Sequence, residues 1–68
     1  MNVTSLIAQN TKNIIKSKGL KQSAVAAFAG YSEKTFSNML NGRKIISDRD
    51  VKAIADALKV TPNELFGC

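Results

Sequence analysis

The sequence has no histidine and a single cysteine, Cys68, among its 68 residues. Without a second cysteine no disulfide can close within the chain, and Cys68 is expected to be a free thiol. Without histidine, no zinc site of the usual cysteine and histidine type can assemble in one chain. The same absences exclude a Ser-His-Asp triad and a Cys-His pair. We therefore expect no enzymatic activity, no metal and no cofactor, and no small-molecule ligand is evident.

Long apolar runs and proline are also scarce. No apolar stretch approaches the roughly 18–20 residues that a membrane span needs. The first ten residues, MNVTSLIAQN, lack the basic region and apolar run of a signal peptide. Pro62 is the only proline, so nothing divides the chain into lobes. These features predict a single cytoplasmic domain over residues 1–68, with no membrane partner.

Acidic residues are almost missing from the first two thirds of the chain. Residues 1–47 contain seven Lys and Arg and one acid, Glu33, a balance of +6. Residues 48–68 contain three bases and four acids, a balance of −1. Such asymmetry indicates that the basic part faces a polyanion. The alternative is a basic surface that serves solubility alone.

Apolar residues do recur at helical spacing along almost the whole chain, and no run alternates with the period of two typical of a strand. The spacing predicts an all-α fold of five short helices. They cover about residues 4–18, 22–29 and 33–40, with a fourth starting at residue 47 and a fifth at residue 61. Helices this short are not stable alone, so we expect them to pack into one compact domain.

Capping residues stand at most of the predicted helix starts. Asn2 or Thr4 would cap the first helix, and Ser32 and Ser47 would cap the third and fourth. Thr61-Pro62-Asn63-Glu64 combines an N-cap Thr, a proline at the first helical position and a Glu that can return the hydrogen bond. These residues strengthen the prediction of three helix starts after residue 30.

Residues 22–41 have the pattern of a helix-turn-helix. Two short helices flank a turn with Gly30, which tolerates a positive φ, and Ala26 is small enough to let the helices approach closely. The inward positions of both helices are apolar. The outer face of the second is polar, as entry into a DNA major groove requires. The alternative is a helical hairpin with no role on DNA.

Four spaced motifs extend this pattern. They are Leu20-Lys21-Gln22-Ser23-Ala24-Val25-Ala26, Gly30-Tyr31-Ser32, Asn41-Gly42-Arg43-Lys44 and Ile54-Ala55-Asp56-Ala57-Leu58-Lys59-Val60-Thr61. Together they resemble the lambda-repressor-like helix-turn-helix family, of the Cro and phage-repressor type, over about residues 12–66. The resemblance implies a transcriptional regulator, in particular a repressor, that binds double-stranded DNA as a homodimer. Its operator would be a palindrome with half-sites about one helical turn (~34 Å) apart.

The resemblance also implies roles for individual residues. The base-reading residues would be Glu33, Lys34, Ser37 and Asn38. The phosphate-binding residues would be Lys21, Gln22, Asn41, Arg43 and Lys44. The dimer interface would contain Val60, Leu65 and Phe66. Amide and cationic groups suit phosphate oxygens, whereas the acid Glu33 does not, which favours a role for it in base selection.

Two core positions depart from the family pattern. Relatives commonly bury an ion pair between an Arg late in the first helix and a Glu just before the Asn-Gly, where this chain has Ile15 and Leu40. One unpaired buried charge costs about 3–5 kcal/mol, whereas replacing both partners can be neutral or stabilising. We therefore predict that Ile15 and Leu40 touch in the core.

Two surface positions also depart from it. Lys21 stands where the family often has Thr; it has no acceptor oxygen for a cap but adds a cation beside Gln22. Phe28 stands where the family usually has an exposed polar residue. It either packs against the first or last helix or is an exposed anchor for a partner. The latter keeps open the alternative function of a protein-interaction module, such as the antitoxin of a toxin–antitoxin pair.

Overall fold

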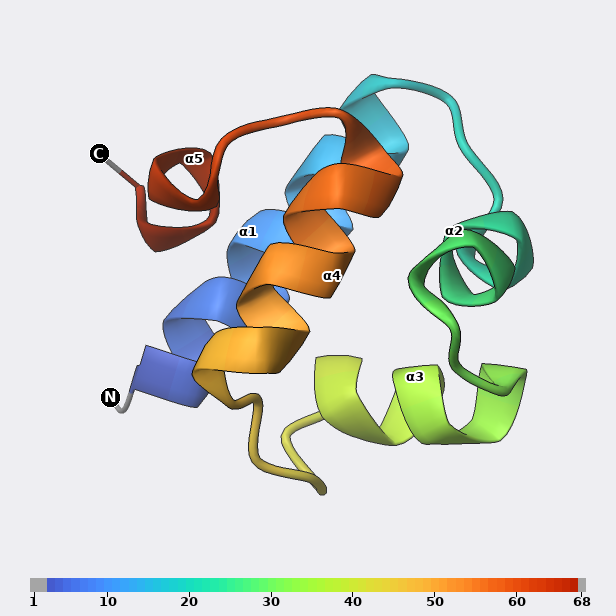
Figure 1. Cartoon of the computed structure of the whole chain (residues 1–68), viewed down its shortest axis with the longest axis horizontal. Coiled ribbons are helices and arrows are strands. Elements are labelled where there is room, and N and C mark those ends of the chain that lie inside the picture. Colours follow the sequence, from blue (N-terminus) through green and yellow to red (C-terminus); the bar gives the residue numbers. More distant parts are fainter. Residues whose placement is uncertain (1–2, 68) are drawn as a thin grey trace.

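The computed structural model describes residues 3–67, and that part of the chain forms five helices and no strand (Figure 1). They are α1 (Val3–Ser17), α2 (Gln22–Ala29), α3 (Glu33–Leu40), α4 (Asp48–Leu58) and α5 (Pro62–Phe66). The predicted all-α fold of five short helices is confirmed. None of the helices described is long and apolar enough to cross a membrane.

Side-chain caps set the starts of the last three helices. The Ser32 hydroxyl accepts a hydrogen bond from a backbone N–H in the first turn of α3 at 3.1 Å. At α4, the Asp50 N–H donates to the Ser47 hydroxyl at 3.3 Å, and the Ser47 N–H donates to the Asp50 carboxylate at 2.9 Å. At α5, the Thr61 N–H donates to the Glu64 carboxylate at 2.8 Å. These starts agree with the sequence prediction.

α2 begins without such a side-chain cap. Thr4 lies inside α1 and is therefore not its N-cap, while Asn2 and Cys68 lie outside the described residues. α1 also ends one residue earlier than predicted, because the chain turns before Gly19, whose φ is 67°. Lys21 precedes α2 and forms no side-chain cap, as its lack of an acceptor predicted.

The other helices pack around α1 and α4, which overlap in the middle of Figure 1 with α4 in front. α1 contacts α3, α4 and α5, whereas α2 contacts α3 and α4. In Figure 1, α5 lies to the left of this pair, and α2 and α3 lie to the right. The inward side chains form one buried cluster: Ile7, Ala8, Ile15, Val25, Ala26, Phe36, Met39, Leu40, Ile46, Val51, Ile54, Ala55, Leu58 and Leu65.

Polar groups inside this packing are paired. Thr11 is fully buried, and its hydroxyl donates to the Ile7 carbonyl at 2.7 Å. The Asn10 amide donates to the Leu65 carbonyl at 2.8 Å and so ties α1 to α5, which lies 55 residues further along the chain. A polar group buried without a hydrogen-bond partner would lower stability, and these bonds avoid that cost for Thr11 and Asn10.

Ile15 and Leu40 are both buried in the same cluster. They come from α1 and α3, which pack against each other. Relatives commonly bury an ion pair at these two positions. Here both positions lie in an apolar environment, where a charge at only one of them would be unpaired. Direct contact between the two side chains stays a prediction, which a double variant can test.

Candidate nucleic-acid interface

α2, the turn after it and α3 form the helix-turn-helix. The turn begins at Gly30, whose φ of 87° lies in the left-handed region that favours glycine. The next N–H, that of Tyr31, donates to the Ala26 carbonyl at 2.8 Å and closes the C-terminus of α2. Ser32 then caps α3. These bonds define the end of α2 and the start of α3.

The two faces of α3 have different environments. Phe36 and Met39 are 0% exposed and Leu40 is also buried, whereas Glu33 and Lys34 are exposed. With 3.6 residues per turn, the apolar residues share one side of the helix. Burial of that side fixes the orientation of α3 and leaves the polar side open to a ligand.

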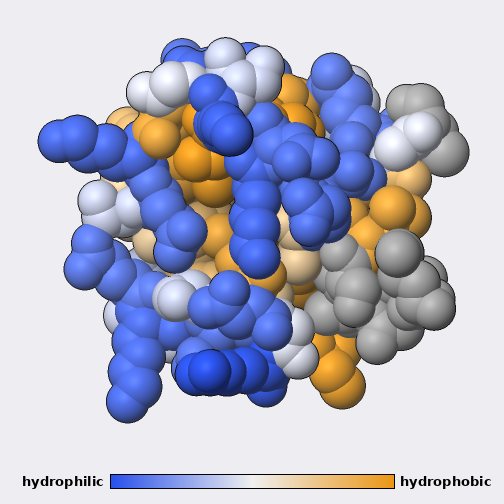
Figure 2. Space-filling model, turned by 180° about the vertical axis from the view of Figure 1, so that it is seen from behind, coloured by the Kyte–Doolittle hydropathy of each residue, from blue (hydrophilic) through white to orange (hydrophobic). Residues whose placement is uncertain are grey.

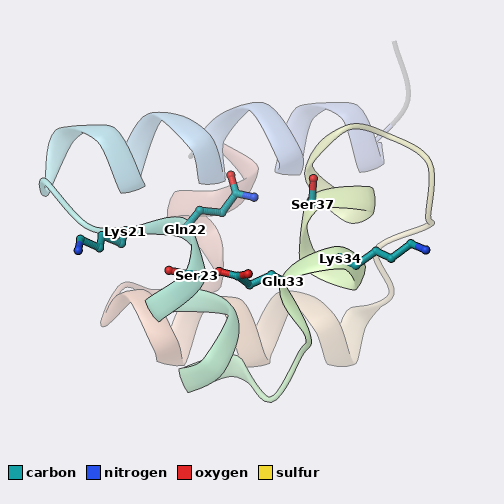
Figure 3. Close-up of a pocket in the computed structure, with 6 residues that line it drawn as sticks. All are labelled: Lys21, Gln22, Ser23, Glu33, Lys34 and Ser37. Atoms are coloured by element: carbon teal, nitrogen blue, oxygen red, sulfur yellow. The ribbon is translucent and has the colours of Figure 1, made fainter.

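An open recess of about 610 Å³ lies between the N-terminal parts of α2 and α3 (Figure 3). It is lined by Lys21, Gln22, Ser23, Glu33, Lys34 and Ser37. Figure 3 shows Lys21 and Lys34 extending away from each other on opposite sides, with Ser23 and Glu33 between them. Five of the nine predicted DNA contacts are thus brought to one opening, and Ser23 joins them as a residue that the sequence reasoning missed.

The N-terminus of α2 opens onto this recess. Lys21 gives it no side-chain cap, and Gln22 and Ser23 are exposed. Free N–H groups in a first turn and the positive end of the helix dipole both favour an anion such as phosphate. The first turn of α3 differs, because it is capped by Ser32 and carries the acid Glu33. The two helix starts therefore differ in what they can bind.

The remaining predicted contacts lie at the other end of α3. Asn38 does not line the recess; it is half-buried, and its carbonyl accepts the Arg43 N–H at 2.8 Å. The Asn41 amide donates to the Ser37 hydroxyl at 3.2 Å. Arg43 and Lys44 are exposed in the segment that follows. Asn38, Asn41, Arg43 and Lys44 thus lie outside the residues that line the recess, although Asn41 is hydrogen-bonded to Ser37 at its edge.

A smaller recess of about 240 Å³ lies beside this end of α3 and includes residues of α1. Gln9 and Lys12 line it together with Asn41 and Gly42. From the sequence, Lys12 counted only among the seven bases of residues 1–47, because its nearness to Asn41 follows from the packing of α1 on α3. The charge of Lys12 was a signal that could have been used.

The outer face of α1 continues this polar surface. Gln9, Lys12, Asn13 and Lys16 are all exposed on it, and the Gln9 amide donates to the Asn13 carbonyl oxygen at 3.2 Å. Figure 2 views the molecule from behind, the side on which α1 lies, and hydrophilic side chains cover most of that face. α1 therefore offers cations beside the end of α3.

A side-chain network holds the turn before α3 to the start of α4. Tyr31 stacks on Phe36 with ring centroids 6.2 Å apart, and its hydroxyl donates to the Asp50 carboxylate. Burial, with the hydrogen bond and charge of Asp50, raises the pKa of Tyr31 to about 12. Burial alone would raise the pKa of Asp50, but hydrogen bonds from Tyr31 and Ser47, helped by the Lys44 charge, hold it below its ordinary value. The network thus favours a neutral tyrosine beside an ionised aspartate.

The structure decides the open alternative for Phe28 and corrects the prediction for Leu65. Phe28 is 81% exposed, so it does not pack against the first or last helix, and the alternative of an exposed side chain holds. Leu65 is 0% exposed because it faces the core from α5, so it cannot also contribute surface to a dimer. Val60 and Phe66, predicted with it, are half-buried and keep some surface for a partner.

A family model described as "Helix-turn-helix domain" matches residues 14–65 of the chain. This match covers more than half of the sequence and includes α2, the turn and α3. No curated protein matches the chain significantly.

Two solved structures share the fold. The restriction-modification controller protein C.AhdI from Aeromonas hydrophila has a TM-score of 0.84 and 24% sequence identity, covering 91% of this chain and 94% of that chain. The clp gene regulator ClgR from C. glutamicum has a TM-score of 0.90 and 17% identity, covering 96% of this chain and 84% of that chain. Both likenesses extend over nearly the whole of the present chain.

Proposed function

The chain belongs to the helix-turn-helix domain family of DNA-binding transcriptional regulators, and we propose that it is a sequence-specific repressor that binds a palindromic operator as a homodimer. This membership agrees with the lambda-repressor-like resemblance of its motifs. Proteins of this family are generally not enzymes. The observation that carries the proposal is the polar recess between α2 and α3, which has the exposed side of α3 on one wall.

In this proposal α3 enters the major groove and its exposed residues read base edges. Lys34 can donate to guanine O6 and N7, and Glu33 can accept from cytosine N4. Ser37 can pair with either kind of edge. Glu33 also repels phosphate, so it would exclude registers in which the start of α3 meets the DNA backbone. Asn38 would read bases only if its half-buried amide reaches the groove.

Contacts to phosphate would hold α3 in place from both of its ends. At the first end, Lys21, Gln22 and the open N-terminus of α2 meet one stretch of backbone. At the other end Asn41, Arg43 and Lys44 meet another. Lys12, which lines a recess with Asn41, adds a cation there. Two clamps on either side of α3 would set its register along the groove.

The dimer would form on the surface between α4 and α5. Val60 and Phe66 are half-buried, and a recess of about 340 Å³ that Phe66 shares with Pro62 and Val51 provides apolar surface beside them. A two-fold interface uses the same patch on both subunits, so burial of one apolar side chain there stabilises the dimer from both sides. Phe66→Glu should therefore convert the dimer to a monomer in sedimentation equilibrium, and an unchanged mass would rule out this patch.

Selection of bound duplexes from a random pool tests the DNA specificity. We expect enrichment of a palindrome with half-sites about 10 base pairs apart, centre to centre. A single enriched half-site would contradict the dimer, and a pool that stays random would contradict sequence-specific binding. A reporter with the selected site placed over its promoter then tests repression, since expression should fall when the protein is present. Higher expression would make the protein an activator.

The alternative function, a protein-interaction module such as an antitoxin, is favoured by the exposed Phe28. The salt dependence of the binding affinity distinguishes DNA binding from protein binding. The logarithm of a DNA affinity falls with the logarithm of salt concentration by about 0.9 for each phosphate contact. An apolar protein contact shows little such dependence.

A further inference from the structure

A groove of about 440 Å³ lies between α2 and the C-terminal part of α4. Its apolar walls include Leu20, before α2, Ala24 and Phe28 on α2, and Ala57 on α4. Phe28 is 81% exposed and Leu20 is 41% exposed. Ala24 and Phe28 are four residues apart and so lie on one side of α2. An exposed large aromatic at the edge of an apolar groove is typical of a contact site for another protein.

This groove shares no lining residue with the recess assigned to DNA. α2 contributes Gln22 and Ser23 to the recess but Ala24, Val25 and Phe28 to the groove. DNA binding therefore gives no reason for the exposure of Phe28. A protein could occupy the groove while the recess holds DNA.

The charges at the groove indicate the chemistry of its occupant. Lys18 and Lys59 border it with one acid, Asp56, so the rim is net positive. Lys59 is the C-cap of α4 with a φ of 59°, a left-handed conformation that glycine adopts more easily. A lysine at this strained position puts a cation at the rim that glycine could not supply. A second copy of the chain would bring an equally positive rim, which disfavours self-association here.

We infer that the groove binds an amphipathic helical segment of another protein, with apolar residues at i and i+4 or i+3 and with acidic residues beside them. This is the helix-in-groove mode, in which an apolar stripe fills the groove and the flanking charges fix its direction. Phe28 and Leu20 contact the stripe, and Lys18 and Lys59 pair with the acids. The inference is independent of the proposed repressor function, because it uses neither the recess nor a DNA ligand.

Selection from a displayed library of random peptides, each about 16 residues or four helical turns long, tests this inference. Binders are selected on the wild-type chain and then compared on Phe28→Ser. The matched control is Ile45→Ser, because Ile45 is 79% exposed but lies outside the groove, in the loop before α4. Identical thermal melts would show that both variants stay folded. Fluorescence anisotropy then measures the affinity of an enriched peptide for each chain.

We expect enriched peptides with an apolar helical stripe and acidic flanks. Phe28→Ser should weaken their binding by about tenfold or more, as loss of an aromatic anchor does, whereas Ile45→Ser should leave it unchanged. Charge reversal by Lys18→Glu with Lys59→Glu should shift the selection toward basic peptides. Failure of enrichment, peptides without acidic residues, or equal affinity for Phe28→Ser would each overturn the inference. Self-association that depends on Phe28 would also overturn it, because the occupant would then be a second copy.

Discussion

The inward and outward faces of α3 differ in burial and therefore in what a substitution affects. On the inward face, Phe36, Met39 and Leu40 are buried in the core. On the outward face, Glu33 and Lys34 are exposed. A core substitution changes packing and acts on stability. An exposed substitution changes what the helix can touch and acts on binding. Within the short helix α3, substitutions on the inward side therefore act on stability, and substitutions on the outward side act on binding.

The largest expected effect comes from the inward side. Ile15→Arg puts an unpaired charge beside the core that holds Leu40, at a cost of about 3–5 kcal/mol. A 68-residue domain has about 3–10 kcal/mol of stability in all, so the variant should lose a large share of its stability. Denaturant unfolding measures this loss, and Lys16→Arg at the exposed neighbouring position is the control. An unchanged midpoint would show that position 15 does not face the core.

The pair can be tested further by the double variant Ile15→Arg with Leu40→Glu. If the two side chains are in contact, the new ion pair should recover part of the stability that Ile15→Arg loses. A double variant that is less stable than either single variant would mean that the two positions do not meet. The same denaturant measurement decides this.

Lys34→Ala tests the outward side. It should leave the melting temperature unchanged while it costs about 1–3 kcal/mol of binding to the selected operator. The loss should be confined to one base position, because a base contact carries sequence information. Lys18→Ala, which removes an exposed lysine at the groove between α2 and α4, is the matched control for charge. Equal weakening on every duplex would assign Lys34 to phosphate instead.

Tyr31→Phe tests the link that holds the turn before α3 to α4. It keeps the ring that stacks on Phe36 but removes the hydroxyl that donates to Asp50, at a cost of about 0.5–1.5 kcal/mol at neutral pH. Stability in urea at pH 7 measures the loss, with no change expected in operator preference. A variant as stable as wild type would mean that the hydrogen bond contributes nothing.

The pH dependence of the same link follows from its pKa shifts. Folding raises the pKa of Tyr31 from 10.0 to about 12, so its contribution is complete below pH 10 and is lost between pH 10 and 12. Folding lowers the pKa of Asp50, so its contribution is complete above about pH 4 and is lost as the pH falls further. Tyr31→Phe should make the free energy of unfolding depend less on pH in both ranges. Tyr31 is the only tyrosine, so phenolate absorbance during an alkaline titration reads its pKa directly.

Arg43→Ala has the smallest expected effect. Loss of one phosphate contact should lower the slope of log affinity against log salt by about 0.9, and it should weaken all duplexes alike. Titrations at several salt concentrations measure the slope, with Lys18→Ala as the control again. If the slope stays the same, Arg43 does not contact phosphate. If the loss depends on sequence, Arg43 reads a base.

Local chemistry made most of the fold predictable. Ser32, Ser47 and Thr61 each start the helix that they were predicted to start, because a cap depends only on residues within one turn. The family resemblance was confirmed for the same reason, since its motifs are short and contiguous.

The candidate site was only partly predictable. Glu33, Lys34 and Gln22 were predicted through the family resemblance, and the structure places all three at exposed helix starts. Lys12 was missed because its neighbour Asn41 lies 29 residues away in sequence. Phe28 stayed undecided because an apolar residue on a helix surface is buried only if another element covers it.

By itself, the sequence determined the helix-turn-helix, its capping residues and the uneven charge, because each depends on residue type and short spacing. Tertiary structure alone decided that Phe28 is exposed and Leu65 is buried, and that Lys12 lies beside the end of α3. It also decided that one side of α2 opens to a polar recess and another to an apolar groove. These properties depend on which helices pack against which, and the free energy of that packing is shared among residues far apart in the chain.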